Sequence, residues 1–258
     1  MPDIFTKSRV GAPPGFFAVE AAGLAWLAEA MPRGGVALPT VQEVTDERLV
    51  LPYVHQRPPS AAAAEAFGRG LAATHRAGAP HHGSPPAGWA GDGYIATLPL
   101  PHATTTAPDG WGPFYAEHRI APFARAAGDR DAGSVLDRLC ERLATHDDVA
   151  GPAEPPARLH GDLWSGNVLW SASGVVLVDP AAHGGHRETD LAMLSLFGLP
   201  HLDRVLAAYD EAFPLAPGWR ERVALHQVHP LLVHAVLFGG GYIRQAVDAA
   251  RRYVDLSG

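Results

Sequence analysis

The sequence predicts an α+β chain of two lobes, a small mixed lobe over residues 1–57 and a larger, mainly helical lobe over residues 58–258. Three observations favour this organisation. Short strand-like runs surround a single helical pattern in the first lobe, whereas apolar residues at helical spacing dominate the remainder. The helical part is interrupted by a two-strand pattern at residues 168–178, and conspicuous polar residues gather around it.

Composition excludes several classes of protein. The 258 residues can bury a sizeable core, and the formal charge of −7 disfavours a nucleic-acid partner. One cysteine rules out an internal disulfide and indicates a reducing compartment. We see neither a signal-peptide pattern nor a stretch resembling a membrane span. The composition predicts a cytoplasmic protein without a membrane partner and leaves the oligomeric state open.

In the first lobe, we expect a strand ending at Ile4–Lys7 and a helix over Glu20–Met31. Lys7 is the only lysine among 20 basic residues, and an arginine does not replace a compact ammonium group everywhere. Glu20 lies on the apolar stripe of the helix. We predict that Lys7 and Glu20 form the lysine–glutamate pair that holds nucleotide phosphates. The alternative is a surface lysine and a glutamate that favours the helix dipole.

Two further strands are expected at Thr40–Val44 and Arg48–Val54, joined by a short polar turn. A proline inside the second strand indicates that this strand is ending or lies at an edge. A hinge between the lobes fits this place. We predict that the backbone of Leu51, Tyr53 and Val54 meets an adenine, with an ordinary edge strand as the alternative.

The second lobe is expected to be mainly helical, with an irregular segment over His81–Asp109 and two strands at Val168–Trp170 and Val175–Val178. The expected helices are Ala61–Arg76, Tyr115–Arg125, Val135–His146, Asp190–Phe197, Leu202–Phe213, Trp219–Phe238 and Ile243–Tyr253.

The segment LHGDLWSGNVLWSASGVVLVD, residues 159–179, contains the order H-x-D-x-x-x-x-N followed by a second Asp after the two-strand pattern. Phosphoryl-transfer enzymes of the kinase type use these groups at these spacings. We therefore predict Asp162 as the catalytic base, and Asn167 and Asp179 as ligands of Mg²⁺, with ATP as the phosphoryl donor. The alternative for each Asp is that it caps a turn.

Other residues of this region are expected to support the site. His160 is predicted to hold the loop, and Asp190 to brace it, although Asp190 could simply cap the following helix. Trp164 is either a packing anchor or a wall for the acceptor. His186, Arg187 and Trp219 are possible substrate contacts. The histidines of the late helix, at positions 226, 229 and 234, lack a cysteine or carboxylate cluster and therefore do not favour zinc.

Several segments together resemble the fructosamine kinase family, a branch of the aminoglycoside-phosphotransferase and protein-kinase-like fold. They are LHGDLWSGN at 159–167, VDPAAHGGHRETDLAM at 178–193, PGW at 217–219 and FGGGY at 238–242. This resemblance implies ATP-dependent phosphorylation of the third carbon's hydroxyl on a ketosamine, such as a fructosamine, a ribulosamine or a glycated lysine. The product would decompose and free the amine, which amounts to deglycation.

The chain departs from this pattern at its start. Kinases of this fold carry a glycine-rich hairpin ahead of the lysine strand, and here only six residues precede Lys7. We expect the first lobe to lack that hairpin and nucleotide affinity to be weakened. Truncation, an abbreviated lid and a non-catalytic ligand-binding protein remain alternatives. A kinase for another small alcohol, aminoglycoside or choline-like, is also open, although an aminoglycoside site should be more acidic.

Overall fold

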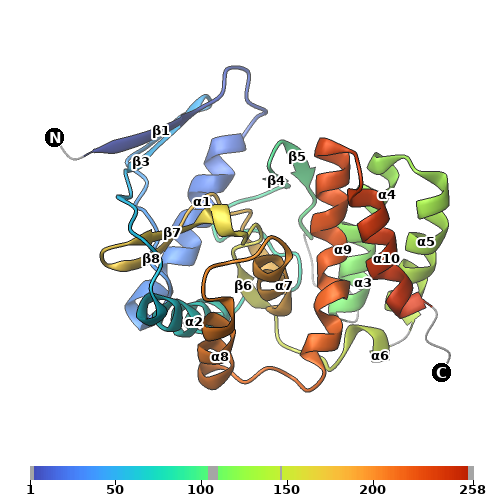
Figure 1. The fold of residues 1–258 in the computed structure, drawn as a ribbon. Helices are drawn as coiled ribbons and strands as arrows, with labels where there is room; N and C mark the ends of the chain where they lie inside the picture. The colour runs from blue at the N-terminus through green and yellow to red at the C-terminus, as the bar shows by residue number, and fades with distance from the viewer. Residues whose placement is uncertain (1–2, 104–109, 146, 255–258) are drawn as a thin grey trace.

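The computed structural model describes residues 3–103, 110–145 and 147–254. Its first lobe holds a three-stranded antiparallel sheet in the order β1 (Ile4–Ser8), β3 (Arg48–Pro52), β2 (Glu43–Val44). In this register Lys7 lies opposite Leu49, and α1 (Phe16–Ala28) packs against the sheet (Figure 1). The strand that carries the lysine is therefore paired along one edge with β3.

Several predicted boundaries in this lobe are wrong, including the end of the strand expected at Arg48–Val54, which lies at Pro52. The helix begins at Phe16 rather than Glu20 and ends at Ala28, and Met31 lies in a separate 3₁₀ turn, Met31–Arg33. The apolar stripe predicted too late a start for this helix, because Phe17 is buried as well and more than one face of the helix is covered. The strand expected at 40–44 is reduced to Glu43–Val44.

The second lobe is mainly helical, as predicted, and α2 and α9 have the predicted bounds (Figure 1). Its helices are α2 (Ala61–Arg76), α3 (Trp111–Tyr115), the π-helical turn η2 (Ala116–Ile120), α4 (Ala121–Ala127), α5 (Arg130–Thr145), α6 (Asp147–Ala150), α7 (Glu188–Leu196), α8 (Leu202–Ala212), α9 (Trp219–Phe238) and α10 (Tyr242–Val254). The last residue of the helix predicted to end at 146 lies outside the described residues.

Short antiparallel pairs complete the second lobe. They are β4 (Gly93–Ile95) with β5 (Leu98–Leu100), β6 (Ala157–Leu159) with β9 (His183–Gly185), and β7 (Val168–Ser171) with β8 (Gly174–Leu177). The β4–β5 hairpin corrects the expectation of an irregular segment at 81–109. Its turn, Ala96–Thr97, lacks the Asn-Gly or Asp-Gly pair typical of tight hairpins, so the hairpin was not predicted from the sequence. Residues 104–109 of that segment lie outside the described residues.

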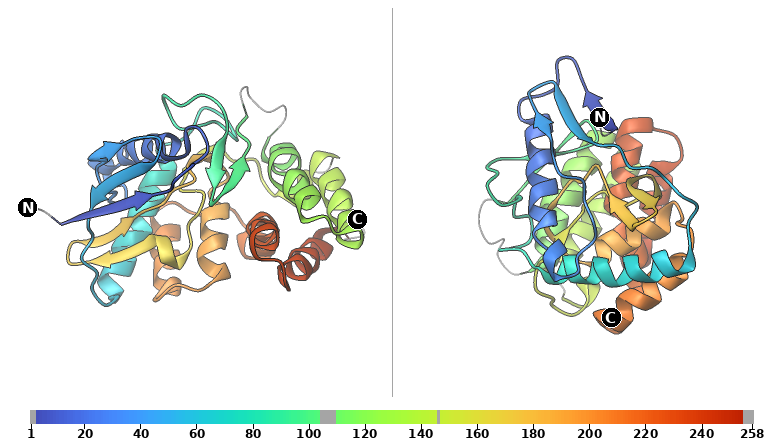
Figure 2. Two further views of the ribbon diagram at one scale, coloured as in Figure 1. Left: turned by 90° about the horizontal axis from the view of Figure 1, so that it is seen from above. Right: turned by 90° about the vertical axis from the view of Figure 1, so that its left-hand side faces the viewer.

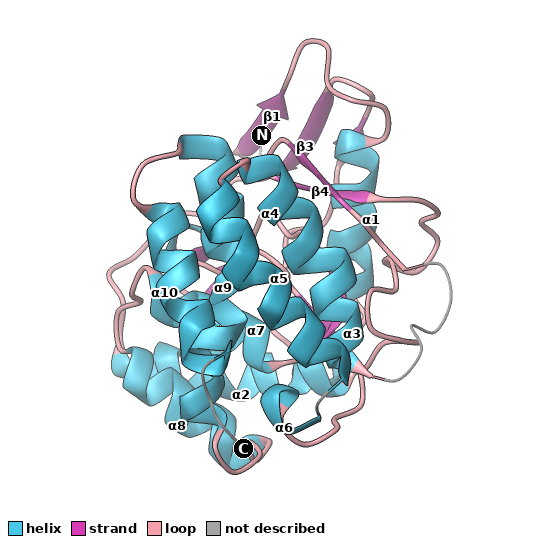
Figure 3. Cartoon of the chain, turned by 90° about the vertical axis from the view of Figure 1, so that its right-hand side faces the viewer, coloured by secondary structure: helices cyan, strands magenta, loops and turns pink. Residues whose placement is uncertain are grey.

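The hydrophobic core consists of two clusters, and neither is confined to residues 1–57. One cluster joins Phe17 and Leu49 of the first lobe to Phe67 of α2 and Leu177 of β8. The other lies among the helical group α3–α5, α9 and α10, which stands to one side in Figure 2 and faces the viewer in Figure 3. The boundary at residue 57 stays a prediction. None of the described helices is long and apolar enough to cross a membrane.

Candidate active site

The conformation of the loop between β6 and β7 depends on Gly161 and on the side-chain amide of Asn167. Gly161 has a φ of 82°, and a Cβ there would lie 2.1 Å from the Ala181 carbonyl oxygen, so a side chain would both strain the backbone and clash. Asn167 donates from Nδ2 to the Asp162 carbonyl oxygen at 2.8 Å and to Asp162 Oδ2 at 3.1 Å. The Asp162 carboxylate is therefore held in one orientation.

Asp190 lies directly behind this loop and is 1 % exposed. Its carboxylate accepts hydrogen bonds from the backbone N–H groups of His160 (2.8 Å) and Gly161 (3.0 Å), and lies 3.1 Å from His75 Nε2. The His160 ring donates from Nε2 to the Val178 carbonyl oxygen at 2.9 Å. The loop is thus hydrogen-bonded both to α7 and to the end of the β7–β8 hairpin.

Lys7 joins the two lobes. Its Nζ lies 2.7 Å from Glu20 Oε2, the predicted partner, and 3.2 Å from Asp179 Oδ1. Burial lowers the pKa of Lys7, but the two carboxylates outweigh it, so the pKa is raised. Burial also raises the pKa of Glu20. An ammonium and two carboxylates therefore meet at one point, opposite Asp162.

A cavity of about 510 Å³ opens at this point. Among the predicted site residues, it is lined by Lys7, Glu20, Asp162, Trp164, Asn167 and Asp179. The other walls come from the β4–β5 hairpin, including Tyr94, and from the C-terminal half of α9, including His234 and Phe238. Neither wall was assigned to the site from the sequence, although Phe238 begins the family-like segment FGGGY.

Other predicted residues lie elsewhere. Leu51, Tyr53 and Val54 do not line this cavity, and the Tyr53 N–H donates to the Asp3 carbonyl oxygen at 2.9 Å. Their contact with an adenine stays a prediction.

The three possible substrate contacts are also placed away from Asp162. His186 and Trp219 are buried outside the cavity. Arg187 pairs with both carboxylate oxygens of Glu154, each at 2.6 Å. It also donates to two backbone carbonyl groups, those of Phe213 and Pro214. The donors of Arg187 are thus committed within the protein, which leaves little for a substrate.

The oxygen atoms next to Asp162 fit a hard divalent cation. The Asn167 Nδ2 is taken up by Asp162, so its Oδ1 is left as a neutral oxygen donor, and the Asp179 side chain is 40 % exposed. Carboxylate and amide oxygens are the ligands that Mg²⁺ prefers. Burial raises the pKa of Asp162 to about 6, so this carboxylate is ionised at pH 7 and is a better proton acceptor than an exposed one.

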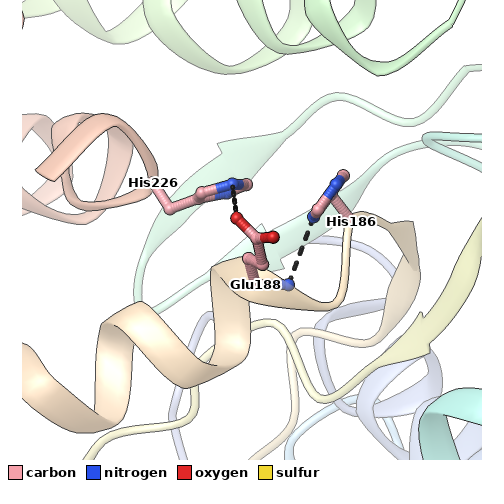
Figure 4. Close-up of side chains that lie close together, drawn as sticks. All are labelled: His186, Glu188 and His226. Carbon is pink, nitrogen blue, oxygen red and sulfur yellow. Dashed lines mark hydrogen bonds and ion pairs between the residues drawn. The ribbon is translucent and has the colours of Figure 1, made fainter. Parts of the chain in front are cut away.

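A second group of ionisable side chains lies where α7 begins beside α9 (Figure 4). His186, Glu188 and His226 are all buried, with one potential ligand atom of each within 4.8 Å of the others. The hydrogen bonds disfavour a metal ion, because Arg222 pairs with both Glu188 oxygens, at 2.9 Å and 2.6 Å. The Glu188 N–H donates to His186 Nδ1 at 3.2 Å, which leaves the proton of the neutral ring on Nε2. We interpret this group as an ion-paired support for α7.

This support makes a testable contribution to stability. Burial raises the pKa of Glu188, but His226 and Arg222 outweigh it and hold the pKa at about 2. Burial also lowers the pKa of His226 and keeps it neutral at pH 7, so Arg222 is the effective cation. Because the folded pKa lies below the ordinary 4.5, the stabilisation is present above pH 4.5 and is lost as the pH falls toward 2.

We expect Glu188→Gln to lower the free energy of unfolding at pH 7 by about 3 kcal/mol, since it leaves Arg222 buried without its partner. Urea denaturation would measure this loss, and the difference from the parent protein should shrink as the pH falls from 4.5 toward 2. The matched control is Glu65→Gln, which breaks the exposed pair with Arg204 and should cost less than about 1 kcal/mol. Equal losses in the two variants would contradict the interpretation.

The fold and the site define a phosphotransferase of the protein-kinase-like class. A family model of fructosamine kinases matches residues 2–255. A Thermus thermophilus protein assigned as a ketoamine kinase is 36 % identical over 240 residues, 92 % of this chain and 82 % of that protein. The chain therefore belongs to the fructosamine kinase family, as its motifs had suggested, and it is an ATP-dependent small-molecule kinase.

Solved structures agree with this assignment. A Thermobifida fusca crystal structure assigned as a fructosamine-3-kinase has a TM-score of 0.87 and 48 % identity, covering 98 % of this chain and 86 % of that one. A gentamicin-bound aminoglycoside phosphotransferase has a TM-score of 0.60 at 10 % identity, with coverage of 98 % and 85 %. At that identity the likeness shows the fold alone, and it confirms the predicted two-lobe α+β class.

Proposed function

We propose that this protein transfers the γ-phosphoryl group of ATP to the third-carbon hydroxyl of a ketosamine such as a ribulosamine or a glycated lysine. Family membership already assigns it to ketosamine phosphorylation in general. The observation that supports the proposal most directly is that Lys7, Asp162, Asn167 and Asp179 line a single cavity. Release of the amine from the phosphorylated product would make the protein a deglycating enzyme, and its single cysteine is consistent with action in the cytoplasm.

In the proposed reaction, the acceptor hydroxyl approaches the carboxylate of Asp162. The hydroxyl oxygen forms a bond to the γ-phosphorus while the bond between that phosphorus and the bridging oxygen of ADP breaks. The hydroxyl proton passes to Asp162, whose raised pKa favours taking it late in the step. The Asn167 amide holds the carboxylate in position throughout. The products are the sugar phosphate and ADP.

The residues around Asp162 would bind the phosphates and help to neutralise their negative charge. Asn167 Oδ1 and the Asp179 carboxylate would hold Mg²⁺, which neutralises phosphate charge when it is bound. Lys7, fixed between Glu20 and Asp179, would direct its remaining ammonium donor toward a phosphate oxygen. Asp179 has a φ of 55°, an uncommon conformation for a residue other than glycine and one often found at functional sites.

Among the described residues, the cavity is lined by several aromatic side chains and by few acidic ones. Trp164 is 40 % exposed, folds over Gly166 and lines the cavity, so we propose it as a wall for the sugar. The acidic residues that line the cavity are Glu20, Asp162 and Asp179, and each already has a partner described above. Among the described residues, no further carboxylate lines the cavity to meet a polycationic aminoglycoside, which favours a ketosamine.

The test is to measure ADP release with Mg-ATP and ribulose-lysine, and to locate the new phosphate on the sugar by ³¹P NMR. Acceptor-dependent ADP release with a sugar phosphate is the expected result. Release with choline or an aminoglycoside, but not with the ketosamine, would move the protein to another acceptor class. Nucleotide binding without turnover of any acceptor would favour a non-catalytic ligand-binding protein.

A further inference from the structure

Buried polar atoms without a partner gather beside the cavities that Asp162 lines. In the described part of the chain, they include His102 Nε2, Arg119 Nε, Arg119 Nη2 and His229 Nε2. These three residues come from separate segments: the loop after β5, the π-helical turn η2, and α9. An unsatisfied buried polar group is costly, so several in one region indicate an occupant that supplies hydrogen bonds.

Arg119 is the strongest donor of this region. Only 2 % of it is exposed, and its guanidinium lies 4.7 Å from the centre of the Phe114 ring. Nη1 donates to the Pro101 and His118 carbonyl oxygens, at 2.7 Å and 2.9 Å, whereas Nε and Nη2 have no partner among the described residues. Burial lowers the pKa of Arg119 to about 9, which leaves it charged at pH 7. Arg119 forms no ion pair with the described residues, although the negative charge of Asp92 acts to raise its pKa.

The neighbouring histidines present acceptors. His102 lies 3.0 Å from the Gly91 carbonyl oxygen through Nδ1, and His183 lies 2.8 Å from the Ala181 carbonyl oxygen through the same ring atom. A carbonyl oxygen only accepts, so Nδ1 carries the proton in each ring. Burial lowers the pKa of both histidines, and the neutral rings therefore leave Nε2 as an acceptor.

This combination of donors and acceptors selects the kind of occupant. An anion would meet the guanidinium favourably but would be repelled by the imidazole lone pairs. A hydroxyl group both donates and accepts, and therefore satisfies Arg119 and a histidine together. Sugar hydroxyls and water share this property.

The region is continuous with the active site. His102 lines the main cavity together with Asp162, and His229 lines a smaller cavity together with Gly161 and Asp162. Arg119 sits in a π-helical turn, Ala116–Ile120, and such turns are frequent at functional sites. An acceptor whose hydroxyl meets Asp162 would thus have its neighbouring hydroxyls beside His102 or His229, and the charge of Arg119 acts on both of these rings.

We propose that His102, Arg119 and His229 form a hydroxyl pocket, which binds hydroxyl groups of the acceptor other than the one that receives the phosphate. The proposal rests on the proposed function, because it concerns the same acceptor. It makes the enzyme selective for polyhydroxylated acceptors over simple amino alcohols such as choline.

The first test needs only the unmodified protein. We would compare kcat/KM for a ribulosamine with that for its 4-deoxy and 5-deoxy analogues. At least one analogue should react about 10- to 100-fold less efficiently, because it leaves a charged buried donor unpaired. If both analogues react as well as the parent compound, the pocket holds ordered water only and the proposal fails. If no ketosamine is turned over at all, the proposed function fails instead.

The second test uses Arg119→Met, which keeps the bulk of the side chain and removes its donors. Discrimination between the ribulosamine and the affected analogue should fall to within about threefold, while the KM for ATP stays unchanged. Arg125→Met, at an exposed position of α4, is the matched control and should keep full discrimination. Full discrimination in a folded Arg119→Met protein would overturn the assignment. If that variant does not fold, the analogue comparison in the unmodified protein decides alone.

Discussion

Replacing Asp162 with Asn should lower kcat by about 10³-fold while leaving nucleotide affinity nearly unchanged. The amide has almost the same shape as the carboxylate, and its oxygen can still accept the hydrogen bond from Asn167 Nδ2. It cannot take up the proton of the acceptor hydroxyl, so the loss should fall on the chemical step. Steady-state rates of ADP release and a nucleotide titration would separate the two effects.

The control for this substitution is Asp203→Asn, which makes the same chemical change at an exposed position of the first turn of α8. It should leave both kcat and nucleotide affinity unchanged. If Asp162→Asn keeps more than about a tenth of the kcat, the carboxylate is not the proton acceptor. A loss of nucleotide affinity as large as the loss of kcat would instead indicate that Asp162 acts mainly in binding.

Replacing Asp190 with Ala should reduce both stability and turnover. Three groups would lose their acceptor, namely the His160 N–H, the Gly161 N–H and the His75 ring. An unsatisfied buried donor costs about 1–3 kcal/mol, so we expect the free energy of unfolding to fall by about 3 kcal/mol or more. The catalytic loop would lose its link to α7, and kcat should fall with it, as expected for a residue that positions Asp162.

Asp190→Asn distinguishes positioning from general destabilisation. One oxygen remains to accept from the loop, so kcat should lie between those of the parent and the Ala variant, with the KM for ATP unchanged in all three. Urea denaturation and steady-state kinetics on the same preparations would provide both measurements. An Ala variant with the parent's kcat would contradict the role of Asp190 in holding the loop, even if its stability had fallen.

Part of the site could be predicted because its geometry is local. His160, Asp162 and Asn167 lie within one loop, and the β7–β8 hairpin returns Asp179 to the same place, so their spacing alone brings them together. The lysine–glutamate pair was also predictable, because the chain contains only one lysine. The same motifs carried the resemblance to the fructosamine kinase family, which the comparisons confirm.

The rest of the site depends on packing between distant segments. The β4–β5 hairpin, with its ordinary turn residues, was expected to be irregular, yet it forms a wall of the cavity. His186 and Arg187 closely follow Asp179, a predicted metal ligand, in sequence, but they lie away from Asp162: His186 accepts from the Glu188 N–H, and Arg187 pairs with Glu154. Proximity along the chain therefore did not predict proximity to the reacting groups.

The sequence by itself determined the class of chemistry, because the predicted catalytic groups around Asp162 belong to one continuous segment whose spacing fixes their arrangement. Only the tertiary structure decided what surrounds them. Lys7 and Asp179 lie far apart in sequence and meet at 3.2 Å. Arg119 donates from a distant helical turn to the Pro101 carbonyl oxygen, next to His102 of the cavity wall. Such contacts are set by the burial of whole elements against one another, and no local pattern of residues encodes them.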